Sequence, residues 1–82
     1  MYVVYVLYSK KTDKYYIGFT ANLIDRLKHH NSGATKSTKT GRPWFVVYKE
    51  KIPDKRSAWL CERQIKKYKG GEAFKVLIRW GV

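Results

Sequence analysis

The chain has 82 residues, and 44% of them are hydrophobic and 16% aromatic, a composition typical of a folded protein and not of a disordered one. So short a chain predicts a single domain, residues 1–82, with one core, and its one cysteine excludes an internal disulfide and a cysteine-based zinc site, as expected in the cytoplasm. Eighteen Lys and Arg against six Asp and Glu give a formal charge of +12, far more than solubility requires, and this predicts a polyanionic partner.

The N-terminal segment predicts a β-hairpin. Tyr2 to Tyr8 is rich in β-branched and aromatic residues, as in a strand covered on both faces, and it is too short for a membrane span or a signal peptide. A polar turn, "SKKTDK", leads to a second strand at Tyr15 to Phe19, in which Tyr16 and Gly18 share one face. Gly18 is compatible with a β-bulge, with close approach of a nucleic-acid backbone, or with both.

A short helix is expected next, with Asn22 as its N-cap and its end near His30. Leu23, Ile24 and Leu27 form its apolar stripe. Arg26 and His30 are four residues apart along one edge of that stripe, so both side chains can point into one cleft.

The segment from Asn31 to Pro43 has no periodicity and predicts a long loop with a function. No acidic residue occurs from Arg26 to Lys49, and cations alternate with small hydroxyl side chains. This pattern suits phosphate oxygens better than a membrane surface, which would require bulky apolar residues between the cations. We therefore expect a nucleic acid, DNA or RNA, as the partner, bound by Thr35, Lys36, Ser37, Thr38, Lys39 and Arg42.

The C-terminal half predicts a third strand at Trp44 to Tyr48 and a long helix at Lys55 to Lys69, preceded by a stop and cap at Ile52-Pro53-Asp54. The apolar stripe of this helix consists of Ala58, Cys61, Ile65 and Tyr68. Glu62 lies on the flank of the stripe, at the expected edge of the sheet. A last helix is expected from Glu72 to about Arg79.

The scarcity of carboxylates excludes several kinds of hydrolase. The six acidic residues are scattered, which argues against a two-metal site and against a paired-carboxylate glycosidase. No GxxxxGK[ST] motif for a phosphate-binding loop is present. Any hydrolysis must therefore use one carboxylate at most, with Tyr, Arg, His or Lys in the other roles.

One ordered set of residues resembles the GIY-YIG endonuclease superfamily. It comprises Tyr5, "YIG" at Tyr16 to Gly18, Arg26, His30 in "HHNSG", "STKTGRP" in the loop and Glu62 in "AWLCERQIK". The likeness is to the small single-domain bacterial members, which are related to the nuclease domain of UvrC-type excinucleases. The chain departs from the family pattern in lacking a glycine in Val3-Val4-Tyr5, a lysine at Phe19 and an asparagine near the C-terminus.

The resemblance implies an α+β fold, a three-stranded antiparallel sheet flanked by three helices, and a metal-dependent endonuclease that hydrolyses DNA in repair or recombination. It implies a catalytic set of Tyr5, Tyr16, Arg26, His30 and Glu62. In this set Glu62 binds one Mg²⁺ or Mn²⁺, and Arg26 braces the phosphate. Tyr5 or Tyr16 takes the proton of the attacking water, helped by nearby cations that favour the phenolate. His30 orients the nucleophile or relays its proton.

Simpler interpretations remain open. The two tyrosines could only fill the core, Glu62 could be an i,i+4 partner of Lys66, and His30 could be a satisfied histidine at the edge of the apolar stripe. The chain could then be a nucleic-acid-binding module that does not cleave, or a subunit that docks into a larger repair complex.

Overall fold

The computed structural model describes residues 1–33, 36 and 38–68. Along this part of the chain the strands are β1 (Tyr2–Ser9), β2 (Lys14–Thr20) and β3 (Trp44–Ile52). The helices are α1 (Leu23–Asn31), the 3₁₀ helix η1 (Lys39–Gly41) and α2 (Lys55–Tyr68). None of the described helices is both long and apolar enough to cross a membrane.

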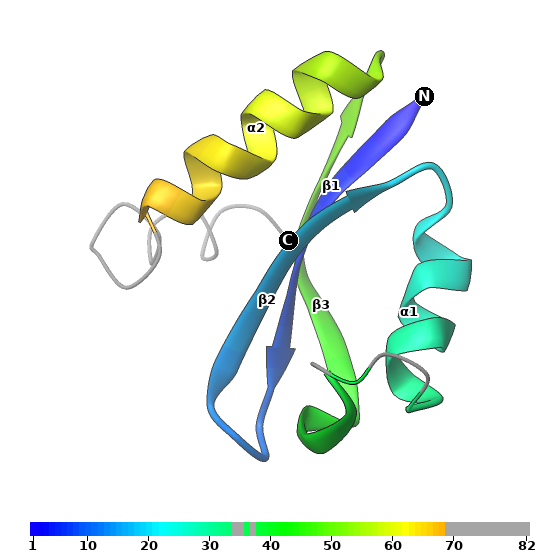
Figure 1. The fold of residues 1–82 in the computed structure, drawn as a ribbon, viewed down its shortest axis with the longest axis vertical. Coiled ribbons are helices and arrows are strands. Elements are labelled where there is room, and N and C mark those ends of the chain that lie inside the picture. The colour runs from blue at the N-terminus through cyan, green and yellow to red at the C-terminus, as the bar shows by residue number, and fades with distance from the viewer. Residues whose placement is uncertain (34–35, 37, 69–82) are drawn as a thin grey trace.

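The three strands form one antiparallel sheet in the order β2-β1-β3 (Figure 1). Because β1 lies in the centre, both of its faces are covered, and residues 4–7 are all buried. The register between β1 and β2 is continuous from Val3 opposite Thr20 to Ser9 opposite Lys14. The pairing of β1 with β3 shifts between Val6 and Leu7.

The sheet separates two apolar clusters, and the two α-helices lie on opposite sides of it (Figure 1). On the α2 side, Val4, Val6, Ile17 and Tyr48 of the strands pack with Ala58 and Ile65 of the helix. On the α1 side, the buried residues are Tyr5, Leu7 and Trp44, against which Leu23 and Leu27 pack. Residues adjacent in a strand therefore face different helices, as their alternation requires.

Both α-helices begin at the expected caps. The side chain of Asn22 accepts a hydrogen bond from the backbone N–H of Asp25 at 3.1 Å. Before α2, the Asp54 carboxylate accepts bonds from the backbone N–H and the hydroxyl of Ser57, at 2.8 and 2.9 Å. These bonds hold the pKa of Asp54 below its ordinary value.

The structure confirms the expected α+β class with its three-stranded antiparallel sheet, the hairpin and the first helix. The third strand is longer than predicted, because Lys49, Glu50 and Lys51 continue the pairing with β1 as far as Ile52. Their charges suggested a strand end, whereas on an edge strand they face solvent. The predicted helix from Glu72 to Arg79 and the end of α2 at Lys69 lie outside the described residues.

Candidate active site

Tyr5 lies at the middle of the central strand, on the face covered by α1, and is 2% exposed. Its partner across the sheet is Gly18 of the YIG motif. A Cβ atom at residue 18 would lie 2.7 Å from the Tyr5 hydroxyl oxygen and 2.9 Å from Cζ. The glycine therefore leaves room for the phenol. The alternative interpretation of Gly18 as a bulge is wrong, because the β1–β2 register passes through it without a shift.

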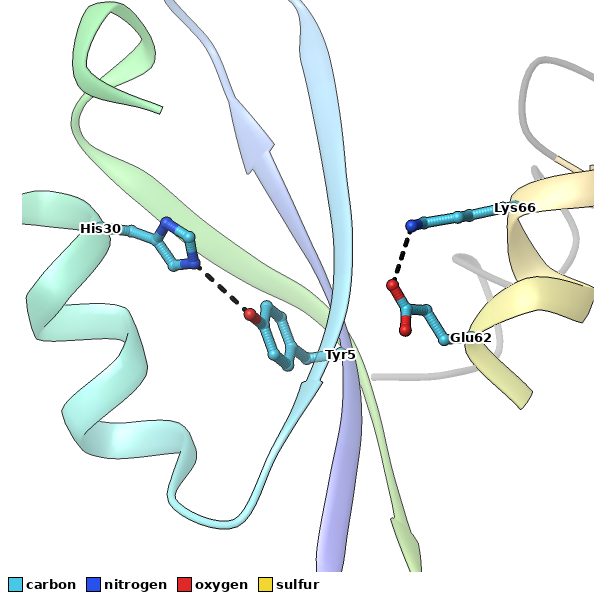
Figure 2. A network of polar contacts seen from close by, with 4 residues as sticks. All are labelled: Tyr5, His30, Glu62 and Lys66. Carbon is cyan, nitrogen blue, oxygen red and sulfur yellow. Dashed lines mark hydrogen bonds and ion pairs between the residues drawn. The ribbon is translucent and has the colours of Figure 1, made fainter. Parts of the chain in front are cut away.

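His30 lies in the last turn of α1 and is 1% exposed. Its Nε2 is 3.4 Å from the Tyr5 hydroxyl (Figure 2), and its Nδ1 is 2.9 Å from the hydroxyl oxygen of Thr38. Both ring nitrogens thus have polar neighbours in the interior. The interpretation of His30 as a histidine at the edge of the stripe underestimated its burial.

Tyr16 is half-buried on the edge strand β2 and lies beside the same imidazole. Its ring centroid is 4.7 Å from that of His30 and 6.4 Å from that of Tyr5, with the two phenol rings stacked at 27°. An edge contact with Trp44 places it over the α1-side cluster. Three of the predicted site residues, Tyr5, Tyr16 and His30, are therefore brought together directly.

Arg26 lies one turn before His30 on α1 and is exposed. Burial lowers the pKa of His30 and raises that of Tyr5, and the charge of Arg26 adds to the first change and opposes the second. The side chain also lines a shallow surface hollow with Asn22 and Asp25. The guanidinium thus lies on the solvent side of the Tyr5–His30 pair, within electrostatic reach of it.

Glu62 lies on α2, across β2 from His30 (Figure 2). Its side chain is 14% exposed and its Oε1 pairs with Lys66 Nζ at 2.8 Å, so the predicted i,i+4 pair is present. It lines a hollow of about 350 Å³ together with Tyr15, Tyr16, Ile17 and Lys66. Tyr16 is therefore the described residue that both contacts the His30 ring and borders the Glu62 hollow.

Burial decides the protonation states of the central pair. It raises the pKa of Tyr5 to about 12; Tyr16 and Glu62 add to the rise, and Arg26 opposes it. The expectation that nearby cations would favour a Tyr5 phenolate is therefore wrong in its net direction. Burial also lowers the pKa of His30, with further lowering by Arg26 and His29. At neutral pH, then, Tyr5 holds its proton and His30 is an uncharged imidazole that can accept one.

The basic loop exposes its cations, whereas the hydroxyl of Thr38 is buried. Lys36, Lys39 and Arg42 are exposed, and Arg42 Nε donates to the Lys39 carbonyl at 3.0 Å. Thr38, predicted to contact phosphate, is instead 0% exposed and directed at His30. Thr35 and Ser37 lie outside the described residues.

Two residues of this region were not singled out from the sequence as part of the site. Asn31 receives the backbone N–H of Trp44 on its Oδ1 at 2.6 Å and donates from Nδ2 to the Trp44 carbonyl at 3.2 Å. Asn31 was assigned to the loop and Trp44 to packing. The one available signal was the position of Asn31 directly after the candidate histidine.

These features define a small α+β protein. It has a buried tyrosine and a buried histidine on one side of its sheet and a half-buried glutamate on the other. Its sequence matches the GIY-YIG catalytic domain over residues 1–73, and the chain belongs to this family. The resemblance drawn from the motifs is therefore confirmed.

Similar proteins come from bacteria and from a protozoan. The chain is 35% identical over 68 residues to the UPF0213 protein SH2523 of Staphylococcus haemolyticus, covering 82% of this chain and 83% of that protein. It is 41% identical over 49 residues to a structure-specific endonuclease subunit SLX1 homolog of Leishmania infantum, covering 54% of this chain and 7% of that one. The solution NMR structure of the UPF0213 protein BH0048 from Bacillus halodurans superposes with a TM-score of 0.49 and 26% identity, with full coverage of both chains.

Proposed function

We propose that this protein is a divalent-metal-dependent endonuclease that hydrolyses phosphodiester bonds in DNA. The contact between the Tyr5 hydroxyl and His30 Nε2, made over Gly18, carries the proposal. A tyrosine that only filled the core could satisfy its hydroxyl with any polar group, whereas here its partner is an imidazole, which can accept the phenolic proton. Family membership and the charge of +12 support a nucleic-acid substrate.

In this reaction a water molecule attacks phosphorus, and its proton has to be taken up. Tyr5 alone is a poor base, because its pKa of about 12 keeps the phenol protonated at neutral pH. His30 solves this difficulty, since Nε2 can accept the phenolic proton while the phenol oxygen takes that of the water. Arg26 then supports the phosphate as negative charge develops, because a guanidinium donates in a fixed fork and stays charged.

The donor set fits a hard divalent ion with few protein ligands. Among the described residues no group of three or more His, Cys, Asp or Glu side chains could hold a metal, so the ion would depend on Glu62, water and substrate phosphate. The ammonium of Lys66 at 2.8 Å shows that this carboxylate attracts a cation where it stands. Bound there, Mg²⁺ or Mn²⁺ would neutralise charge on the phosphate oxygens.

The test is nicking of supercoiled plasmid with Mg²⁺ or Mn²⁺ by the wild type and by Glu62→Gln and Arg26→Ala. We expect each substitution to lower the rate by about 10²-fold or more, as removal of a charge-stabilising group does elsewhere. Arg63→Ala is the matched control, because its guanidinium covers the ring of Trp59 at 4.8 Å on the exposed face of α2. Equal nicking by all four proteins would disprove the proposal.

A second function is favoured by the Glu62–Lys66 ion pair, which is what a purely structural glutamate would form. The protein would then bind DNA or RNA without cleaving it. Binding without any product under either metal, unaffected or strengthened by Glu62→Gln, would identify this function. Nicking that appears only after a second protein is added would indicate a subunit of a larger complex.

A further inference from the structure

Thr38 has a position that binding of phosphate does not explain. It lies in the basic loop between the exposed Lys36 and Lys39, yet it is 0% exposed. Its hydroxyl oxygen is 2.9 Å from Nδ1 of His30, a shorter contact than the 3.4 Å between Nε2 and Tyr5. The better-defined hydrogen bond of the imidazole is therefore the one on its far side.

Two hydrogen bonds to its backbone carbonyl hold Thr38 against the imidazole of His30. Its carbonyl accepts from the indole Nε1 of Trp44 at 2.7 Å and from the backbone N–H of Gly41 at 3.2 Å. Trp44 is in turn held through its backbone by Asn31, the residue next to His30. The end of α1 is thus bonded twice, through His30 to Thr38 and through Asn31 to Trp44.

The ring of Trp44 fits because residue 41 has no side chain. A Cβ atom at Gly41 would lie 2.4 Å from Cζ2 of Trp44 and 2.9 Å from Cε2. The indole is therefore packed directly on the η1 backbone, which leaves little freedom for the Thr38 carbonyl that it contacts. Because the position of Thr38 is fixed in this way, its hydroxyl can determine which nitrogen of the His30 imidazole carries the proton.

Both partners of His30 are hydroxyl groups, which can donate or accept, and one assignment of directions lets Tyr5 give up its proton. Tyr5 keeps its proton at neutral pH, so its O–H is available to donate to Nε2, and this direction requires an Nε2 that carries no hydrogen. The single proton of the neutral ring then sits on Nδ1 and is donated to the Thr38 oxygen. Free histidine prefers the opposite tautomer, with the proton on Nε2, which could not take a proton from Tyr5.

We propose that Thr38 is a positioning residue that holds His30 in the Nδ1–H tautomer, so that Nε2 is free to accept the proton of Tyr5. Its effect on cleavage rests on the proposed nuclease function, whereas its effect on the tautomer does not. The basic loop then has two roles: its cations face the nucleic acid, and its buried threonine sets the proton acceptor. The position of Thr38 in the loop and the tautomer of His30 therefore depend on each other.

The direct test is ¹⁵N NMR of the histidine ring nitrogens in the full chain without DNA or metal, with His29→Gln used to assign His30. We expect wild-type His30 to show a protonated Nδ1 and a bare Nε2. Thr38→Val, which replaces the hydroxyl by a methyl of similar size, should shift the ring toward Nε2–H, and Thr38→Ser should retain the wild-type pattern. A wild-type spectrum with the proton on Nε2 would overturn the proposal, even if Thr38→Val did not fold.

The kinetic test separates positioning from binding. Thr38→Val should lower kcat for plasmid nicking by about 10- to 100-fold, a part of the 10²–10⁴-fold that a general base contributes, and should leave KM nearly unchanged. Thr38→Ser should restore kcat, whereas Lys39→Ala should raise KM and leave the tautomer as it is. Loss of kcat in Thr38→Ser equal to that in Thr38→Val would show that the hydroxyl is not responsible. A fixed Nδ1–H tautomer in a protein that never cleaves would refute the nuclease function alone.

Discussion

Substitution of Gly18 by alanine tests whether the YIG glycine exists to accommodate Tyr5. A methyl group at residue 18 would meet the Tyr5 hydroxyl oxygen at 2.7 Å and Cζ at 2.9 Å, whereas ordinary contacts begin at 3.4 Å. The phenol must therefore move by about 0.7 Å at its hydroxyl and about 0.5 Å at Cζ. The ring is 2% exposed and belongs to the cluster with Leu7 and Trp44, so it has little room to do so.

Two effects of opposite sign determine the change in stability. Overpacking of a core costs about 1–3 kcal/mol, while alanine gains about 0.4–1 kcal/mol by restricting the unfolded chain. The net loss lies between about 0 and 2.6 kcal/mol and is centred on about 1.3 kcal/mol, which in a chain of this size lowers Tm by roughly 5–10 °C. The rate of nicking should fall as well, because the displaced hydroxyl no longer meets His30 Nε2 at 3.4 Å.

Urea unfolding of the wild type, Gly18→Ala, Tyr5→Phe and the double variant isolates the contact. Tyr5→Phe removes the oxygen involved in the 2.7 Å contact, so alanine at residue 18 should cost about 0.5–1 kcal/mol less in that background. Gly18→Ala with wild-type stability, or a cost that is the same in both backgrounds, would refute the role assigned to the glycine.

Two further predictions concern charge. His30 is buried with its pKa lowered, among Tyr5, Tyr16, Thr38, Arg26 and His29, so the unfolded chain binds a proton at higher pH than the folded one does. The free energy of unfolding should consequently fall as pH drops below about 6.5, by at most ~1.4 kcal/mol per pH unit from this group. His30→Gln should reduce that slope. Urea titrations across this pH range that give parallel curves for the wild type and His30→Gln would contradict the assignment. Alanine at Lys36, Lys39 or Arg42 should lower the magnitude of the slope of log K against log salt for duplex DNA by up to about 0.9, as measured by fluorescence anisotropy. Thr38→Ser should leave this slope unchanged. An unchanged slope in all three alanine variants would show that the DNA binds elsewhere on the protein.

The strands and helices were largely predictable because each has a strong local signal. The alternation in "KYYIGFT" assigned Tyr16 and Gly18 to one face of the second strand, and the cap at Asn22 marked the start of α1, with Arg26 and His30 along one edge of its apolar stripe. The end of β3 was missed because Lys49, Glu50 and Lys51 carry no apolar pattern. Their strand conformation comes from pairing with β1, which is a long-range effect.

The interior of the loop could not be predicted from its pattern. Small polar residues among cations suggest an exposed phosphate-binding segment, and for Lys36, Lys39 and Arg42 the exposure agrees. Thr38 differs because one indole and one imidazole, from β3 and α1, close over it. Such a contact depends on tertiary structure, and a single hydroxyl residue carries no periodic signal that distinguishes burial from exposure.

The placement of the site residues on both sides of the sheet restricts where a substrate could be held. His30 and Tyr5 lie on the α1 side and Glu62 on the α2 side, with the edge strand β2 between them (Figure 2). A phosphate that is to meet both groups cannot lie over the centre of the sheet, where β1 is covered on each face. It has to come to the outer edge of β2, beside the half-buried Tyr16, whose ring contacts His30 and borders the Glu62 hollow. The position of Tyr16 at this edge then explains the second tyrosine of the motif, because its ring lies between the proposed proton acceptor, His30, and the proposed metal ligand, Glu62.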